Sequence, residues 1–349
     1  MDIKTSLYGL SFEEIQKVVR EENVPSYRAG QLADWVFKKH ISTWDEARNL
    51  PPELCKALEK KFLLSSLELE EVSESADYES RKFLFRTVDQ QFIESVLILQ
   101  QERRTVCVST QVGCKIGCVF CASGKGKFGR NLTPGEIVEQ VAWIEKKIAS
   151  KITNVVFMGM GEPLDNFEAT MKALDILQAK WGFYLGARRI TVSTSGITPK
   201  ILEFVKRSEG RVRLSISLHS SNDKKRSELV PINKKYNLKE LTQTLRKIYT
   251  ELKRDITFEY TLIAGVNDSA DEARGVAKIA KPLEAKVNII PYNPIHGENF
   301  KTPSAVQVEN FRAILEQNGV RVIVRQTAGR DIDAACGQLR LVREQKASS

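Results

Sequence analysis

The hydrophobic pattern changes along the chain, and from about residue 100 onward it is regular. Short apolar runs there alternate with segments in which apolar residues recur at helical spacing. Apolar runs of roughly four to eight residues predict buried strands, and the amphipathic segments between them predict helices. Repeated alternation of strand and helix predicts an α/β fold with a parallel sheet, either open or closed into a barrel. The expected strands cover residues 105–110, 152–158, 188–194, 211–218, 256–263, 285–292 and 320–327.

The N-terminal part of the chain is instead predicted to be helical, over residues 1 to about 64. The segment SFEEIQKVVREEN begins with Ser11, and Glu14 three positions later completes a capping box. The segment PPELCKALEKKF opens with prolines, which the first helical turn tolerates, and it places Cys55 beside apolar residues of the core. After an acidic piece, RKFLFRTVDQQFIESVLILQ alternates well enough to predict two strands joined at Asp89 and Gln90.

These patterns predict three parts. We expect a small helical accessory domain at residues 1–75, a strand pair at 76–100, and a main domain at 101–349. A length of 349 residues suits one large domain with an accessory piece.

The composition is that of a soluble globular chain, with 42% hydrophobic and 28% charged residues. The N-terminal sequence MDIKTSLYGLSFEE lacks the apolar core of a secretory signal, and no run of roughly 18 apolar residues occurs. We therefore expect a cytoplasmic monomer without a membrane partner.

The chain has an excess of positive charge, with 53 Lys and Arg against 44 Asp and Glu, or a net charge of +9. Phosphate groups are attracted to such a surface, so we expect a nucleic-acid partner, although many basic proteins bind none. The candidate phosphate contacts are Arg103, Arg104, Lys125, Lys127, Arg130, Arg188, Arg189, Lys224, Lys225, Arg226, Lys234 and Lys235.

Cysteines provide the most specific chemical signal. Four of the six lie within residues 106–130, and Cys114, Cys118 and Cys121 have C-x3-C-x2-C spacing. In a reducing compartment such clustering indicates metal binding or catalysis rather than a disulfide framework. Zinc requires four ligands in a closed tetrahedron, and Cys107 is a possible fourth, whereas an iron–sulfur cube can function with one iron left open. The local spacing leaves both identities open.

Nearly all other unusual residues follow directly after the expected strands. Loops at the carboxyl ends of strands build the active sites of α/β barrels, so we expect these loops to meet at one mouth. GMGEP places the carboxylate of Glu162 beside flexible glycines, although a structural tight turn is the simpler interpretation. His219 and Asn293 also have structural explanations, as a core histidine and a turn cap. Cys336 belongs to the same predicted mouth, so with Cys107 it is either a nucleophile or redox pair, or a small buried hydrophobe.

Seven motifs follow one another along the chain: VCVSTQVGC, FMGMGEPL, TVSTSG, SISLH, VPINKKYN, NPI and DIDAACGQL. The N-terminal helices add SYRAGQLADWVFKK and STWDEARNLPPEL. Together these motifs resemble the radical S-adenosylmethionine superfamily, and more narrowly the RlmN-type adenine-C2 methyltransferases of 23S rRNA and tRNA. No single motif is decisive, but seven in the same order are highly specific. The resemblance covers nearly the whole chain and implies a partial (β/α)6-type radical SAM barrel, with residues 1–75 as an RNA-contacting accessory domain.

The resemblance also implies the cofactors. Cys114, Cys118 and Cys121 would bind three irons of one 4Fe–4S cluster, and the open fourth iron would chelate S-adenosylmethionine. An electron from the cluster would cleave the sulfonium and release a 5′-deoxyadenosyl radical. Gly161 and Glu162 would hold the methionine amine. The rest of the cofactor site would be formed by Ser193, Ser217, Leu218, His219 and Asn293.

A two-cysteine mechanism that consumes two S-adenosylmethionine molecules follows from the same resemblance. Cys336 would first take a methyl group, and the radical from a second cofactor molecule would remove a hydrogen from that S-methyl. The resulting methylene radical would add to adenine C2, and Cys107 would help to resolve the adduct. A Cys107–Cys336 disulfide would remain for external thiols to reduce. Glu94 matches a family position assigned as a proton acceptor, and an external donor would supply the electron.

The implied partners are 23S rRNA, in its peptidyl-transferase region, and tRNAs with an adenosine next to the anticodon. Access to adenine C2 requires an unstacked base, so single-stranded or opened RNA is expected. The loop GKGKFGRN after the cysteines is richer in lysine and glycine than is usual in the family. Three alternatives stay open: a Cfr-type enzyme that methylates C8 of the same adenosine, a radical enzyme with another substrate, and a non-enzymatic zinc-stabilised RNA-binding protein.

Overall fold

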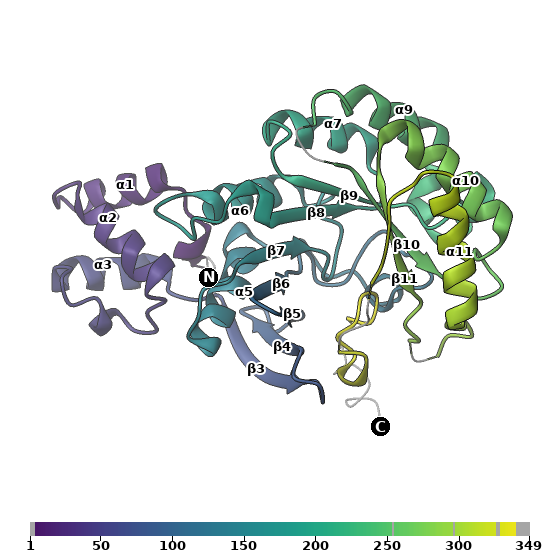
Figure 1. Ribbon diagram of the computed structural model, residues 1–349. Helices are drawn as coiled ribbons and strands as arrows, with labels where there is room; N and C mark the ends of the chain where they lie inside the picture. The colour runs from purple at the N-terminus through teal and green to yellow at the C-terminus, as the bar shows by residue number, and fades with distance from the viewer. Residues whose placement is uncertain (1–3, 253–254, 296, 326–328, 340–349) are drawn as a thin grey trace.

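One curved sheet organises the molecule, which is represented by a computed structural model that describes residues 4–252, 255–295, 297–325 and 329–339. Its strands are β3 (Leu67–Glu74), β4 (Ser80–Thr87), β5 (Phe92–Gln100), β6 (Arg103–Cys107), β7 (Asn154–Phe157), β8 (Ile190–Thr194), β9 (Arg213–Ser217), β10 (Thr257–Leu262), β11 (Lys286–Pro291) and β12 (Val322–Val324). These ten strands of the described residues are ordered β12-β11-β10-β9-β8-β7-β6-β5-β4-β3 (Figure 1). Neighbours from β6 to β12 are parallel, whereas β3, β4 and β5 extend the sheet with antiparallel pairing.

Helices cover the outer face of this sheet and form a separate group at the N-terminus (Figure 1). The α-helices are α1 (Phe12–Glu21), α2 (Arg28–Ala33), α3 (Pro52–Lys61), α4 (Ala122–Lys125), α5 (Pro134–Ile148), α6 (Phe167–Gln178), α7 (Thr198–Arg207), α8 (Asp223–Leu229), α9 (Leu238–Ile248), α10 (Ala270–Ala280) and α11 (Ala305–Gln317). Shorter elements are the 3-10 turns η1 (Leu7–Gly9), η3 (Trp44–Glu46), η4 (Ala187–Arg189), η5 (Pro231–Lys234), η6 (Lys281–Leu283) and η7 (Arg330–Ile332), the π-helical turn η2 (Asp34–Lys38), and the parallel pair β1 (Thr5–Ser6) and β2 (Phe62–Leu63).

The prediction of a parallel α/β sheet is confirmed. Each expected strand appears, as β6 to β12; most of their ends lie within two residues of the prediction, but β6 ends at Cys107, three residues before the predicted end at residue 110. The last one ends at Val324, and residues 326–327 of that prediction lie outside the described residues. In the part of the chain that the structure describes, β12 does not pair with β3, so the barrel stays open on one side.

Strand β3 is the strand of the large sheet that the sequence did not predict, because its many glutamates obscure the alternation of apolar and polar residues. Leu67, Leu69 and Val72 pack toward the core, but the pairing register with β4 shifts between Leu69 and Glu71. Such a bulge breaks the period of two on which strand prediction depends. The predicted boundary at residue 75 falls in the turn between β3 and β4, which pair directly with one another.

The N-terminal helices share one hydrophobic core with the sheet. Helix α1 begins with the predicted capping box of Ser11 and Glu14, and α5 begins with the equivalent pair Thr133 and Glu136. Cys55 is half-buried and packs against this core, as expected. The accessory helices are thus fused to the barrel by packing as well as by sequence.

The C-terminal segment 329–339 lies beside the open side of the barrel and is drawn in yellow near the C label of Figure 1. The backbone N–H of Ala76, in the β3–β4 turn, donates to Asp331 Oδ2 at 2.8 Å, and Ala122 N–H donates to the carbonyl of Gly337 at 2.7 Å. These contacts fix the segment that contains Cys336 over the interior of the sheet. None of the helices in the described ranges is both long and apolar enough to cross a bilayer.

Candidate active site

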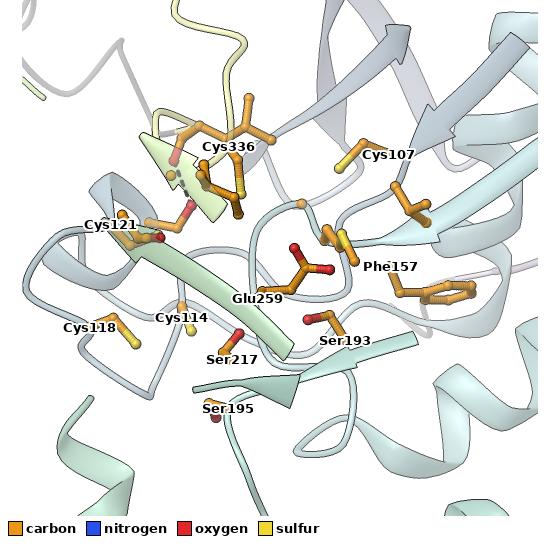
Figure 2. Close-up of a pocket in the computed structure, with 18 of the residues that line it drawn as sticks. Cys107, Cys114, Cys118, Cys121, Phe157, Ser193, Ser195, Ser217, Glu259 and Cys336 are labelled. Atoms are coloured by element: carbon orange, nitrogen blue, oxygen red, sulfur yellow. Dashed lines mark hydrogen bonds between the residues drawn. The ribbon is translucent and has the colours of Figure 1, made fainter. Parts of the chain in front are cut away.

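A cavity of about 190 Å³ lies inside the barrel, where the loops after the parallel strands meet (Figure 2). It is the mouth that the sequence predicted. Of the predicted site residues, those that line it are Cys107, Cys114, Cys118, Cys121, Gly161, Glu162, Ser193, Ser217, His219 and Cys336. Leu218 and Asn293 lie immediately behind the wall, where both contact the lining through hydrogen bonds, and Glu94 lies apart from it.

The three cysteines of the C-x3-C-x2-C loop present their thiols to one end of this cavity (Figure 2). Gly113 and Gly117 adopt φ angles of +72° and +73°, which let the loop reverse between strand β6 and helix α4. An apolar cluster surrounds the thiols, including Phe120 and Tyr292. Such a shell limits access of water to an inorganic centre.

Burial keeps these thiols neutral in the absence of a metal. It raises the pKa of Cys114 to about 12, and it also raises the pKa of Cys118 and of Cys121. A bound iron would displace the proton, since a coordinating thiol is deprotonated outright. Within the described ranges, no three His, Cys, Asp or Glu side chains are grouped so as to hold a metal ion as they stand. Three soft thiolate donors in an apolar pocket nevertheless fit the preference of iron–sulfur clusters.

Gly161 and Glu162 occupy the turn after β7. A Cβ atom at Gly161, whose φ is +102°, would lie 2.6 Å from Cβ of Gln111, so the turn requires glycine there. The Glu162 carboxylate accepts hydrogen bonds from the backbone N–H and hydroxyl of Ser195, both at 2.7 Å, and from Leu164 N–H at 3.0 Å. Burial raises the pKa of Glu162 more than these bonds lower it. A cationic amine in the cavity would favour its ionised form.

His219 and Asn293 are held in place by the backbone of neighbouring loops. His219 Nδ1 accepts from Thr261 N–H at 2.9 Å, and burial lowers the pKa of the imidazole to about 3, so the ring is neutral at physiological pH. The amide of Asn293 donates to the carbonyl of Cys336 at 3.1 Å and accepts from Arg330 at 3.1 Å. Asn293 thus positions the Cys336 segment.

All six cysteines lie in the described part of the chain, and each is a free thiol, so the predicted Cys107–Cys336 disulfide is absent from this structure. In the view of Figure 2, Cys336 lies between the loop cysteines and Cys107. Electrostatic coupling links Cys336 to both Cys121 and Cys107. Burial raises the pKa of Cys107 to about 12. Cys336 is open to the cavity, but the surrounding protein still desolvates it and raises its pKa to about 11.

Glu94 is placed differently from the cysteines. It is buried on β5, where its carboxylate forms an ion pair with Lys82 at 3.2 Å, and it is not among the cavity-lining residues of the described chain. The two partners are both nearly inaccessible to solvent. Its proposed role as a proton acceptor stays a prediction.

Two charged residues of the cavity wall were missed by sequence reasoning. Glu259 lies on β10, and Arg325 follows β12 and donates to the Glu259 carboxylate at 3.3 Å. The available signal was a carboxylate between Phe258 and Tyr260 in an otherwise apolar strand, since a buried charge requires a partner or a function.

One of the predicted phosphate contacts is wrong. Arg226 is fully buried and donates to the carbonyls of Ser195, Ser217 and Leu218, so it ties together the loops after β8 and β9. Arg130 is half-buried and is paired with Asp89 and Glu136, and its contact with phosphate stays a prediction.

The chain is similar to known proteins over nearly its whole length. The Radical SAM superfamily model matches residues 108–274. The probable dual-specificity RNA methyltransferase RlmN of Clostridium botulinum (strain Eklund 17B / Type B) is 43% identical over 335 residues, which are 96% of each chain. The dual-specificity RNA methyltransferase RlmN of Nautilia profundicola is 42% identical over 330 residues, which are 90% of this chain and 93% of that protein. The crystal structure of a radical SAM methyltransferase from Sphaerobacter thermophilus is 43% identical, covers 96% of this chain and 99% of its own, and gives a TM-score of 0.91.

Proposed function

Since the chain belongs to the RlmN family of radical S-adenosylmethionine RNA methyltransferases, we propose that it methylates C2 of a specific adenosine in 23S rRNA and of the adenosine next to the anticodon in some tRNAs. The observation that supports this most directly is the meeting of five cysteines at one cavity, three from a single loop and two from opposite ends of the barrel domain. These RNA substrates place its action in the cytoplasm. The family also argues against a non-enzymatic zinc protein.

Cys114, Cys118 and Cys121 would hold a 4Fe–4S cluster, and their soft donors and apolar shell fit it. When bound, the cluster and S-adenosylmethionine supply the electron, the radical and the methyl group of the reaction. Glu162 would accept hydrogen bonds from the methionine amine, while Ser193, Ser217 and His219 would contact the remainder of the cofactor.

Cys336 would act as the methyl acceptor. Its sulfur would attack the methyl carbon of one S-adenosylmethionine, whose own sulfur would leave with the electron pair of the broken bond. The thiol must lose its proton first; burial raises the pKa of Cys336, and the positive charge of Arg325 offsets part of that rise. The carbon held on Cys336 would then be joined to adenine C2, and Cys107 would release the product. In that release the sulfur of Cys107 would bond to the sulfur of Cys336, and the electron pair of the broken carbon–sulfur bond would stay with the carbon, which takes up a proton. An external thiol would then reduce the resulting disulfide.

Nucleoside analysis tests the proposal. In a strain that lacks this gene, 2-methyladenosine should disappear from 23S rRNA and from the substrate tRNAs, and the wild-type gene should restore it. Unchanged 2-methyladenosine would defeat the proposal. If the deletion strain instead lacks 8-methyladenosine, the enzyme catalyses the Cfr-type reaction. Restoration in rRNA alone would remove tRNA from the proposed substrates.

A further inference from the structure

One carboxylate oxygen at the cavity has no hydrogen-bond partner among the described residues. Glu259 is only 4% exposed, and its Oε2 atom makes no hydrogen bond, although the residue lines the cavity. Figure 2 shows the carboxylate in the middle of the group, close in this view to Ser193 and Ser217. A buried acceptor without a donor is destabilising, by roughly 1–3 kcal/mol in general, and natural proteins rarely keep one without a reason.

The other oxygen of the same carboxylate is fully engaged. Glu259 Oε1 accepts from the amide of Asn288 at 3.0 Å, from the hydroxyl of Ser215 at 3.1 Å and from Arg325 at 3.3 Å. Donors from strands β9 and β11 and from the chain after β12 therefore fix the orientation of the side chain. This arrangement holds Oε2 in place and leaves its lone pairs to whatever occupies the cavity.

We propose that Glu259 binds the ribose of S-adenosylmethionine, its unpartnered oxygen Oε2 accepting hydrogen bonds from the ribose hydroxyls; this assignment rests on the proposed function. S-adenosylmethionine offers three sets of donors, which are the methionine amine, the ribose diol and the adenine amine. The Glu162 carboxylate already provides an acceptor for the first. A vicinal diol presents two O–H donors side by side, and a carboxylate is the side chain that most commonly accepts from a nucleotide ribose. The hydroxyls of Ser193 and Ser217 can donate to the ribose oxygens in return.

A buried water is the main competitor for Oε2. The Oδ1 atom of Asn288 is also buried without a partner, and one water could donate to both atoms. Asn288 does not line the cavity, however, whereas Glu259 does. If water satisfies Oε2 permanently, the loss of that acceptor will not affect cofactor binding.

The test is a binding measurement on anaerobically purified protein with its cluster intact, using the variant Glu259→Gln. The amide oxygen of glutamine can keep the partners of Oε1, while its NH2 group replaces the free acceptor with a donor. The probes are S-adenosylhomocysteine, which has no methyl group to transfer, and its 2′,3′-dideoxy analogue. Glu272→Gln serves as the matched control, because Glu272 is an equally buried carboxylate that is held by Ser220 and Ser221 outside the cavity.

Wild-type protein should bind the dideoxy analogue about 10- to 100-fold more weakly than S-adenosylhomocysteine, since hydrogen bonds to a charged acceptor are lost. Glu259→Gln should bind S-adenosylhomocysteine about 10- to 100-fold more weakly than wild type and should no longer discriminate between the two probes. Glu272→Gln should keep the wild-type affinity and discrimination, and all proteins should have equal iron content.

Other results would overturn the assignment. Unchanged affinity with normal methylation in Glu259→Gln would identify the buried water, and an equal loss for both probes would place the contact elsewhere on the ligand. Unchanged affinity with lost methylation would make Glu259 a participant in proton transfer instead. In each of these cases the nucleoside analysis of the deletion strain would still stand, so the ribose assignment alone would fail. Cluster-loaded wild-type protein that binds neither probe would end both proposals.

Discussion

Two buried glutamates in this molecule have opposite surroundings. Glu139, on α5 at the junction with the N-terminal helices, is 0% exposed and accepts hydrogen bonds from the hydroxyls of Ser6, Ser65 and Ser66 and from two backbone N–H groups. Glu259, at the cavity, is 4% exposed and leaves one oxygen without a donor. The carboxylate at the junction is thus fully hydrogen-bonded, whereas the carboxylate of Glu259 keeps one oxygen without a donor among the described residues.

The same contrast applies to cysteine and gives the largest predicted effect. Cys336 faces the cavity, whereas Cys55 packs against the core of the accessory helices. Cys336→Ala should lower RNA methylation by at least about 10³-fold, because it removes the thiol that is proposed to carry the methyl carbon. Its urea unfolding midpoint should stay near that of wild type. Cys55→Ser is the control and should retain activity, and substantial methylation by Cys336→Ala would refute the role of this thiol.

At the junction between α5 and the N-terminal helices we expect the opposite result, a loss of stability without a loss of activity. Glu139→Ala removes the common acceptor of five donors and should lower the free energy of unfolding by about 2–4 kcal/mol. The protein that remains folded should methylate RNA with an unchanged KM. Urea titration provides the first quantity and steady-state kinetics the second. If Glu139→Ala unfolds like wild type but binds RNA or cofactor less tightly, the division between fastening and functional carboxylates is wrong.

The sequence predicted the strands and the position of the cavity, but not the different hydrogen bonding of the two glutamates. The strands β6 to β12 and the converging loops followed from the alternation of apolar runs and helices, and the C-x3-C-x2-C spacing located one end of the cavity. The hydrogen bonds that surround Glu139 and that orient Glu259 come from residues 29 to 133 positions away in the sequence. Local patterns contain no information on such pairings. For the same reason the sequence suggested Arg226 as a phosphate contact, since a basic residue looks alike in sequence whether it is buried or exposed.

A smaller effect is predicted for the glycine-rich loop that follows the cysteines. A Cβ atom at Gly124 would lie 2.8 Å from both the backbone N and O of Cys118, whereas one at Gly126 would meet its nearest atoms only at 3.9 Å. Gly124→Ala should therefore displace the cluster loop, at a cost of about 1–3 kcal/mol, and lower the iron bound per chain. Gly126→Ala should bind iron like wild type. Equal iron content in the two variants would show that the loop tolerates crowding and that Gly124 does not position Cys118.

The smallest effect concerns Asp89, which holds Arg130 and so anchors the far end of the same loop. Hydrogen bonds from Arg130 lower the pKa of Asp89 to about 2, from 3.8. Because the folded pKa is depressed, the ion pair contributes its full stability above about pH 3.8, and this contribution is lost as the pH falls through about 2. The pair is partly exposed, so Asp89→Asn should cost less than about 1 kcal/mol at pH 7.

That cost should shrink on acidification and vanish only below about pH 2, when urea unfolding of the variant and of wild type is compared at each pH. Glu53→Gln provides the control, since the pair of Glu53 with Lys56 is longer, at 3.6 Å, and more exposed. Its unfolding should match that of wild type at every pH. A difference between Asp89→Asn and wild type that does not shrink as the pH falls toward 2 would mean that packing, rather than the charge of Asp89, anchors Arg130. In that case the ion pair with Glu136 on α5, and not the pair with Asp89, would hold Arg130 in place.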